Sequence, residues 1–264
     1  MASSEQDIVR ARSFHRAWYR VPPSLRRIAG RFLNRVGVSG WISNWMRDTP
    51  QTKDFFTMTP ETPPAILKCL QQVAVEGSLG DYYEFGMYRG YTFWYAQRSA
   101  NKLGLKLNFY GFDSFQGVPQ PEPDEVNEFK KGDYACSREQ VERHLRMAGG
   151  VDWTRTHLIE GFYENSLQPA LKAQLNMGPV AVALIDCDLY QSTLHVLRFL
   201  DSLLQDGSIL MFDDWNCFNQ SDEQGERRAF REFLEQHPQW RSESFVSFGW
   251  HGQSFVLRQN NKGE

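Results

Sequence analysis

Two apolar runs in the sequence each end in a pair of acidic residues, a pattern that could carry chemistry. Asp186 directly follows the run VAVALI and Asp188 comes two residues later, whereas Asp213 and Asp214 directly follow the run SILMF. A carboxylate beside an apolar core is costly unless its charge is compensated. Four carboxylates at two strand ends therefore require a partner such as a cation, or a role such as proton transfer.

The chemistry that suits this pattern is the binding of one small, hard cation. Asp213 and Asp214, together with Asp186 from the other run, could supply oxygen ligands to Mg²⁺, which leaves its remaining positions to water or substrate. Asp188, two residues beyond Asp186, could face the same place without touching the metal and act as a general base. The alternative is that these acids are solvated loop residues or helix caps.

A second candidate site is a glycine turn after an earlier apolar run. The stretch EFGMYRG contains Glu84, Gly86 and Gly90 in the spacing E-x-G-x-x-x-G, a tight turn at which a ligand can approach the backbone. Asp113 ends the next apolar run and could accept hydrogen bonds from a ribose diol. A nicotinamide-dependent oxidoreductase would offer a similar acid but would normally show G-x-G-x-x-G, which is absent here.

These residues must be positioned by alternating strands and helices, which the chain shows from about residue 60. Such alternation predicts a mostly parallel sheet with helices on both faces, and a final hairpin would add an antiparallel last strand. Ligands of such sheets bind beyond the carboxyl ends of the strands, where all four acids would lie. The predicted strands are 81–86, 106–112, 156–160, 180–186, 208–212 and two within 242–258; the predicted helices are 91–104, 137–149, 166–175, 192–207 and 226–237.

Composition limits the class of protein. The chain has 264 residues, 41% of them hydrophobic, which suits one domain with an appendage, and its net charge of −3 argues against a nucleic-acid partner. It shows no apolar signal segment and no run of membrane-spanning length. Four scattered cysteines without C-x-x-C spacing are typical of a reduced protein. We therefore expect a cytoplasmic protein that does not insert into membranes.

The first part of the chain differs in character from the rest. Residues 1–54 are rich in Arg, Trp and Pro, and the stretch SLRRIAGRFLNRVGV places apolar side chains on one helical face and arginines largely on the other. Membrane-surface helices share this pattern, as do helices docked on their own domain or on a partner subunit. We expect a docked helix and a homodimer, and we divide the chain into residues 1–54 and 55–264.

Several stretches together resemble the macrocin O-methyltransferase family. They are EFGMYRG, YGFDSFQGVPQP, GDYACSREQV, IEGFYENSL, IDCDLYQST and MFDDW. The resemblance implies a Rossmann-like class I methyltransferase sheet with an N-terminal helical lid over the substrate. It also implies transfer of a methyl group from S-adenosylmethionine to a sugar hydroxyl of a small-molecule glycoside, with Mg²⁺ as a second cofactor.

The resemblance further implies a role for each matched residue. Asp188 would be the general base, and the metal ligands would be Asp186, Asp213 and Asp214. The cofactor-binding residues would be Glu84, Gly86 and Gly90 around the methionine part, Asp113 at the ribose, Ser137, Gly161 and Phe162 near the adenine, and additionally Ser114 and Asp186.

Three other functions remain open on the sequence alone. A catechol-like or other polyol acceptor could replace the sugar, since any vicinal diol could chelate the metal. A nicotinamide-dependent oxidoreductase would need no metal. A non-catalytic protein that binds an acidic partner through its basic N-terminal helix would leave the strand-end acids unexplained.

Overall fold

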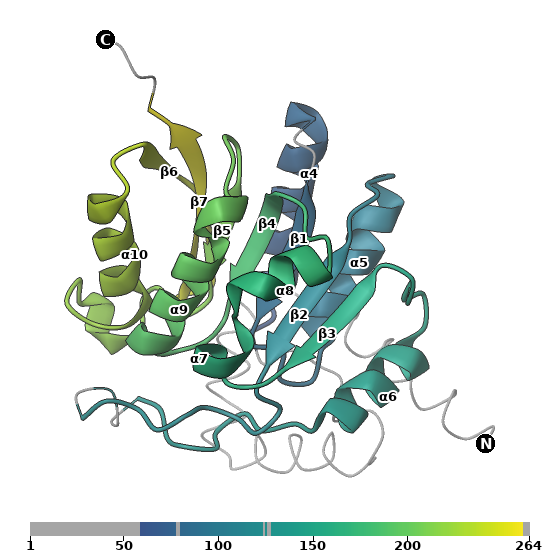
Figure 1. The fold of residues 1–264 in the computed structure, drawn as a ribbon, viewed down its shortest axis with the longest axis horizontal. Helices are drawn as coiled ribbons and strands as arrows, with labels where there is room; N and C mark the ends of the chain where they lie inside the picture. Colours follow the sequence, from purple (N-terminus) through teal and green to yellow (C-terminus); the bar gives the residue numbers. More distant parts are fainter. Residues whose placement is uncertain (1–58, 78–79, 124, 126–127, 261–264) are drawn as a thin grey trace, which may run out of the picture. The chain divides into compact units, whose positions relative to one another are not determined.

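The computed structural model describes residues 59–77, 80–123, 125 and 128–260 of the chain, so the predicted lid, residues 1–54, lies outside the described part. Within that part, one sheet has the strand order β3-β2-β1-β4-β5-β7-β6 (Figure 1). The strands are β1 (Asp81–Phe85), β2 (Phe109–Asp113), β3 (Thr156–Glu160), β4 (Val180–Ile185), β5 (Ile209–Phe212), β6 (Trp240–Phe248) and β7 (Gly252–Gln259).

The pairing of the strands confirms the predicted sheet. β1 pairs in parallel with β2 and β4, β2 pairs with β3, and β4 pairs with β5. β7 enters antiparallel to β5 and pairs with β6 as a hairpin. The carboxyl ends of β1 to β5 therefore lie at one edge of the sheet, and the strand order reverses between β1 and β4, where sheets of this kind bind ligands.

Helices connect the strands and cover both faces of the sheet. α4 packs against α5 and α5 against α6, while α9 packs against α7 and α10. The helices are α4 (Thr62–Glu76), α5 (Tyr91–Lys102), α6 (Arg138–Ala148), α7 (Tyr163–Ser166), α8 (Pro169–Gln174), α9 (Tyr190–Leu200) and α10 (Gly225–Gln236).

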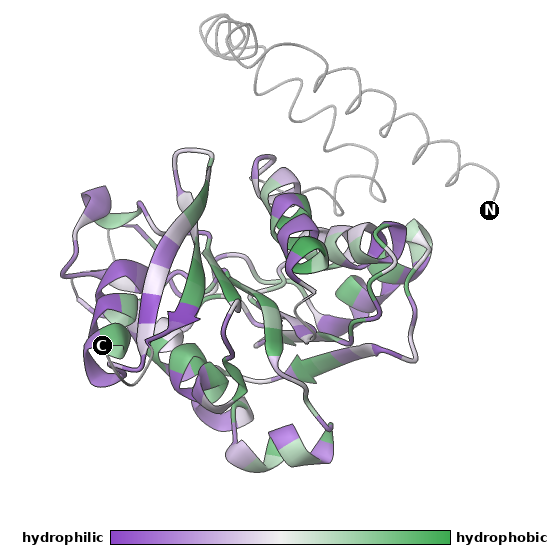
Figure 2. Ribbon diagram, turned by 90° about the horizontal axis from the view of Figure 1, so that it is seen from above, coloured by the Kyte–Doolittle hydropathy of each residue, from purple (hydrophilic) through white to green (hydrophobic). Residues whose placement is uncertain are grey.

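The central strands are buried on both faces, which explains their unbroken apolar runs. Figure 2 shows the hydrophobic colour running along them. Successive side chains of a strand point to opposite faces. In β1, the ring centre of Tyr82 lies 6.3 Å from that of Phe93 of α5. On the other face, Tyr83 stacks on Tyr110 with ring centres 5.1 Å apart, in the apolar layer to which α9 and α10 contribute. Packing on both faces therefore holds the strand ends that carry the acids.

The helix ends agree with the sequence in one place and differ in another. The predicted capping box at α6 is confirmed, because Ser137 and Gln140 exchange side-chain-to-backbone hydrogen bonds. The helix predicted to reach Gly207 is shorter, since α9 ends at Leu200 and a 3₁₀ turn follows over Asp201–Leu203. Gly207 has a φ of 86° and belongs to the turn before β5 instead, where its N–H bonds to the carbonyl of Leu257.

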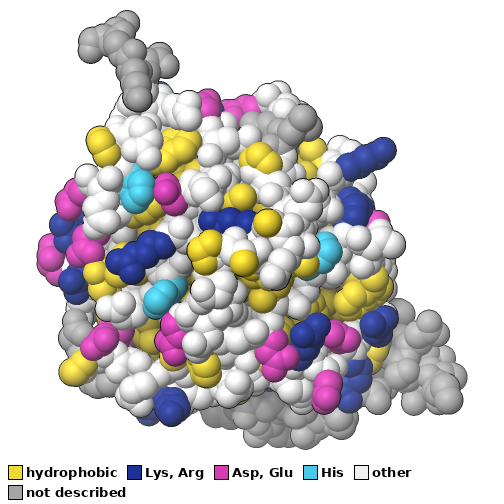
Figure 3. All heavy atoms as spheres, in the orientation of Figure 1, with side chains coloured by type: hydrophobic (Ala, Val, Ile, Leu, Met, Phe, Trp, Pro, Cys, Tyr) yellow, Lys and Arg dark blue, Asp and Glu magenta, His cyan; other side chains and the backbone are white. Residues whose placement is uncertain are grey.

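The surface carries charges of both signs. Figure 3 shows acidic and basic side chains interspersed on the face viewed there. Among the described residues, no helix has both the length and the apolar character that crossing a membrane requires.

Candidate functional site

The acids after β4 and β5 lie side by side because the hydrogen-bond ladder continues beyond the strands. The N–H of Asp186 donates to the carbonyl of Phe85 at 2.8 Å, and the N–H of Asp213 donates to the carbonyl of Ile185 at 3.0 Å. These two hydrogen bonds join the carboxyl ends of β1, β4 and β5. The loops that follow these three strands therefore start side by side.

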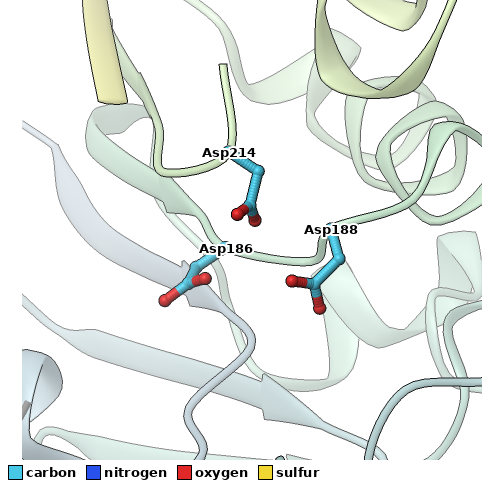
Figure 4. A group of neighbouring side chains, drawn as sticks. All are labelled: Asp186, Asp188 and Asp214. Atoms are coloured by element: carbon cyan, nitrogen blue, oxygen red, sulfur yellow. The ribbon is translucent and has the colours of Figure 1, made fainter. Parts of the chain in front are cut away.

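Three of the four predicted acids face one another. Asp186, Asp188 and Asp214 each bring a carboxylate oxygen within 4.8 Å of the others (Figure 4). The backbone at Asp188 has a φ of 63°, a left-handed conformation that aspartate tolerates better than most residues. This turn brings the side chain of Asp188 back toward the carboxylates that follow β4 and β5.

Burial and mutual repulsion make the charged form of this cluster unfavourable. Burial raises the pKa of Asp186 well above its usual range, and the negative charges of Asp213, Asp214 and Asp188 raise it further. Burial likewise raises the pKa of Asp188, with the Asp214 carboxylate as the next cause. Like charges at this distance cannot all be retained unless an opposite charge compensates them.

Asp213 is not one of the three carboxylates that lie within 4.8 Å of one another, although its charge acts on Asp186. Its Oδ1 accepts a hydrogen bond of 2.7 Å from the Thr62 hydroxyl of α4, and its Oδ2 lies 3.4 Å from Nδ1 of His251 in the turn between β6 and β7. Asp213 is only 4% exposed, and burial raises the pKa of its carboxyl group to about 7. The expected role of Asp213 as a metal ligand therefore stays a prediction, and that role would require the carboxylate to leave Thr62.

The cluster has the chemistry that a small divalent cation requires. All three of its members offer carboxylate oxygens, which are the preferred ligands of Mg²⁺. Oδ2 of Asp214 is buried and receives no hydrogen bond from any residue that the structure describes. A cation would satisfy this oxygen and compensate the repulsion between the carboxylates.

The glycine turn touches the acid cluster through its backbone. Gly86 has a φ of 88°, and a Cβ atom there would lie 1.7 Å from the carbonyl oxygen of Asp186. Gly90, with a φ of 81°, precedes α5, and a Cβ atom there would meet Val141 of α6 at 3.0 Å. Only glycine fits at the first position, because the collision would be with backbone that cannot move aside.

Asp113 holds this turn in shape. Its Oδ2 accepts hydrogen bonds from the N–H groups of Met87 at 2.7 Å and Tyr88 at 3.1 Å, and its Oδ1 accepts one of 2.6 Å from the N–H of Phe115. A carboxylate has about four lone pairs, so one acceptor position of Asp113 remains for a ligand hydroxyl. The predicted contact with a ribose stays a prediction.

The other predicted cofactor residues lie in loops at the same edge or at a helix start. The N–H of Gly161 donates to the carbonyl of Asp113 at 2.9 Å, and Phe162 directly precedes α7. The hydroxyl of Ser114 closes a local turn by donating to the carbonyl of Gly117. Ser137 caps α6, the helix that packs on Gly90. Their cofactor-binding roles remain predictions.

Glu84 lies beneath the glycine turn as a fully buried acid. It accepts hydrogen bonds of 2.7 Å from the hydroxyls of Tyr82 and Thr92, and it also accepts one from the N–H of Phe93 in the first turn of α5. Burial raises its pKa to about 8 in spite of these hydrogen bonds. The structure thus places Glu84 where it ties β1 to the start of α5.

This raised pKa predicts a pH-dependent stability. Below the pKa of the unfolded chain, Glu84 is protonated in both states; between about pH 4.5 and 8 only the folded state keeps the proton, so stability falls as pH rises. Glu84→Gln cannot ionise and should gain stability relative to the wild type by up to about 1.4 kcal/mol for each pH unit in that window. Urea unfolding at pH 5, 6, 7 and 8 measures this, with the exposed variant Glu164→Gln as the control. A difference that does not change with pH would contradict it.

The sequence did not single out three residues that contact the acids. Thr62 and Cys217 bond to the carboxylates of Asp213 and Asp214, and Glu226 of α10 accepts a hydrogen bond from the backbone of Asp214. Thr62 belongs to α4, which lies far before the acids in the sequence. Glu226 belongs to α10, which follows the acids after an intervening loop. The only signal for Glu226 is an acid on the apolar side of an amphipathic helix.

A protein-family profile described as Macrocin-O-methyltransferase (TylF) matches residues 45–238, which is more than half of the chain. Among curated proteins, the 8-demethyl-8-(2,3-dimethoxy-alpha-L-rhamnosyl)-tetracenomycin-C 4'-O-methyltransferase of Streptomyces olivaceus is 27% identical over 156 residues. That match covers 56% of this chain and 57% of the relative, so the chain spans little more than half the length of the relative.

Two solved structures are similar to the described fold. The O-methyltransferase NovP gives a TM-score of 0.64 at 21% identity, over 76% of this chain and 80% of NovP. CalS11, a calicheamicin methyltransferase, gives 0.59 at 21% identity, over 74% of this chain and 77% of CalS11. At these identities the likeness concerns the fold, and it confirms the expected Rossmann-like sheet.

Proposed function

Because the chain belongs to the macrocin O-methyltransferase family, we propose that it transfers a methyl group from S-adenosylmethionine to a sugar hydroxyl of a glycosylated small molecule. The observation that carries this proposal is the meeting of the Asp186, Asp188 and Asp214 carboxylates beside a glycine turn that touches the backbone of Asp186. A proton acceptor and a place for a cofactor would thereby lie at one edge of the sheet. A sugar as the acceptor is supported by the name of the Streptomyces olivaceus relative, a 4'-O-methyltransferase whose named substrate carries a rhamnosyl group.

The cofactor would bind along the turn from Gly86 to Gly90. S-adenosylmethionine supplies a methyl group on a positively charged sulfur, which a hydroxyl oxygen can attack. The glycines keep side chains out of the space above the turn, and the free acceptor position of Asp113 suits a ribose hydroxyl. Gly161, whose N–H bonds to Asp113, brings the end of β3 to the same place.

Asp186 and Asp214 would hold a divalent cation, and Asp213 would join them if its carboxylate leaves the Thr62 hydroxyl. Mg²⁺ supplies positive charge that compensates these carboxylates and favours the deprotonated form of a nearby hydroxyl. A sugar with two neighbouring hydroxyls would suit such a site. The buried free oxygen of Asp214 supports this assignment.

Asp188 would accept the proton of the reacting hydroxyl. It is 9% exposed, and its burial beside Asp214 raises its pKa, which makes its carboxylate a stronger base than an exposed aspartate. As the oxygen–methyl bond forms and the sulfur–methyl bond breaks, the hydroxyl proton passes to the carboxylate of Asp188. Holding the acceptor and the methyl group in line would supply much of the remaining acceleration.

Calorimetry with the full chain tests the cofactor. We expect S-adenosylmethionine and its demethylated product to bind with micromolar-range affinity, and Asp113→Ala to weaken binding by about 1–3 kcal/mol because it removes a hydrogen-bond acceptor and loosens the turn. Asp201→Ala, after the far end of α9, is the matched control. Binding of NADH without binding of S-adenosylmethionine or its demethylated product would refute the proposal.

A labelled-methyl assay then tests the acceptor. Glycosides that carry a vicinal diol should become labelled, and the same glycosides with one hydroxyl of the diol blocked should not. A catechol serves as the competing acceptor, and its exclusive labelling would replace the sugar by a phenol in the proposal.

A further inference from the structure

Glu226 is a buried acid at the start of α10 that contacts the cluster from behind. Glu226 is only 1% exposed, and its Oε2 accepts a hydrogen bond of 3.0 Å from the backbone N–H of Asp214. Its other oxygen, Oε1, is buried and receives no hydrogen bond from the described residues. A buried carboxyl group is costly to fold, so its position calls for a local function.

The local backbone allows Glu226 to reach this position. Gly225 has a φ of 55°, and a Cβ atom there would lie 2.7 Å from the ring of Phe218 and 3.9 Å from the carbonyl oxygen of Asp188. The first turn of α10 therefore starts directly against the segment that carries the acids. A side chain at position 225 would push the helix, and Glu226 with it, away from Asp214.

The neighbouring Arg227 contacts the same segment from the more exposed side. Its Nε donates to Oδ1 of Asp222 at 2.7 Å, and its Nη1 donates to Oδ1 of Asn216 at 3.3 Å. Its guanidinium also lies 5.0 Å from the ring centre of Trp215. Glu226 and Arg227 thus hold the loop after β5 at its second residue, Asp214, and at Asn216.

Asp214 depends on this support more than Asp213 does. Asp213 is held by the sheet ladder, by Thr62 and by His251. The carboxylate of Asp214 bonds to Asp188, a member of the same cluster, and it has a 3.5 Å contact from the Cys217 thiol, a weak donor. The backbone from which this carboxylate projects is held by Glu226, which accepts the hydrogen bond of the Asp214 N–H.

We propose that Glu226 is a positioning residue, which holds the N–H of Asp214 so that the Asp214 carboxylate stays directed at Asp186 and Asp188 and the cluster keeps its shape for a divalent cation. This inference rests on the proposed cation site. Groups that orient metal ligands in this way usually change metal affinity by 10- to 100-fold when they are removed.

Titration of the full-length protein with Mn²⁺, followed by calorimetry and by electron paramagnetic resonance, tests the inference without an activity assay. Glu226→Ala should weaken Mn²⁺ binding by about 10- to 100-fold, because the N–H of Asp214 loses its acceptor. Glu226→Gln should stay within about threefold of the wild type, since its amide oxygen can accept the same hydrogen bond. Glu226→Asp is too short to reach and should resemble Glu226→Ala.

The control variant is Asp81→Asn, which alters another buried carboxylate that accepts backbone hydrogen bonds, at the opposite edge of the sheet. It should bind Mn²⁺ as the wild type does. Binding of S-adenosylmethionine and the melting temperature show that each variant is folded. Unchanged Mn²⁺ binding in Glu226→Ala would overturn the inference, and so would an equal loss in Glu226→Gln, because charge rather than the hydrogen bond would then matter. A wild type that binds S-adenosylmethionine but no Mn²⁺ would overturn the cation site and the inference with it.

Discussion

Replacing Asp188 by asparagine should lower the rate of methyl transfer by roughly 10²–10⁴-fold, while binding of S-adenosylmethionine stays unchanged. Asparagine keeps the size and polarity of the side chain but cannot accept the proton of the acceptor hydroxyl. Turnover should be measured at saturating Mg²⁺, so that a loss of metal is not mistaken for a loss of the base. The wild-type rate should fall as pH drops and Asp188 becomes protonated, and Asp188→Asn should lack this acidic limb.

The structure makes this experiment discriminating because Asp188 lies in the same cluster as Asp186 and Asp214. Asp201→Asn, at a partly buried aspartate after the end of α9, is the control for loss of one aspartate outside the cluster. If Asp188→Asn binds Mg²⁺ poorly but turns over normally once the metal saturates, Asp188 is a ligand, and the proton acceptor must be sought in Asp186.

Removal of divalent cations with a chelator should abolish methyl transfer, and added Mg²⁺ should restore it. Without a cation, the clustered carboxylates repel one another and their raised pKa values favour protonated forms that are poor ligands and poor bases. The measurement is the initial rate in chelator, followed by titration with Mg²⁺. Full activity in excess chelator would remove the cation from the proposal.

Two alanine variants then identify the residues that hold the cation. Asp214→Ala should require at least about 10-fold more Mg²⁺ for half-maximal activity, because its free oxygen lies in the cluster. Asp213→Ala should cause a smaller shift, since the Asp213 carboxylate bonds to Thr62 instead. The reverse order would mean that the Asp213 carboxylate leaves Thr62 when the metal binds.

Much of the fold could be predicted because it depends on local patterns. The unbroken apolar runs before Asp186 and Asp213 mark strands buried on both faces, and alternation with helices requires those strands to run parallel. Parallel strands place their carboxyl ends at one edge, so the meeting of acids from separate segments follows from the order of elements. The capping box at Ser137 is likewise a short-range pattern, and the structure confirms it.

Two features depended on contacts that local patterns do not contain. The sequence pattern extended the helix after Asp188 to Gly207, but α9 ends at Leu200 because the chain must turn there to enter β5. Glu226 reads as an ordinary helix residue until α10 packs against the loop that carries Asp214.

The amino-acid sequence by itself determined that four aspartates stand at the carboxyl edge of a parallel sheet, because strand period and the alternation of elements are local properties. Only the tertiary structure decided which of them face one another. Asp213 and Asp214 are neighbours in a bend after β5, and their spacing does not say which of the two turns toward Asp186 and Asp188. That choice is made by Thr62 of α4, His251 of the β6–β7 turn and Glu226 of α10, which approach the acids from separate parts of the chain.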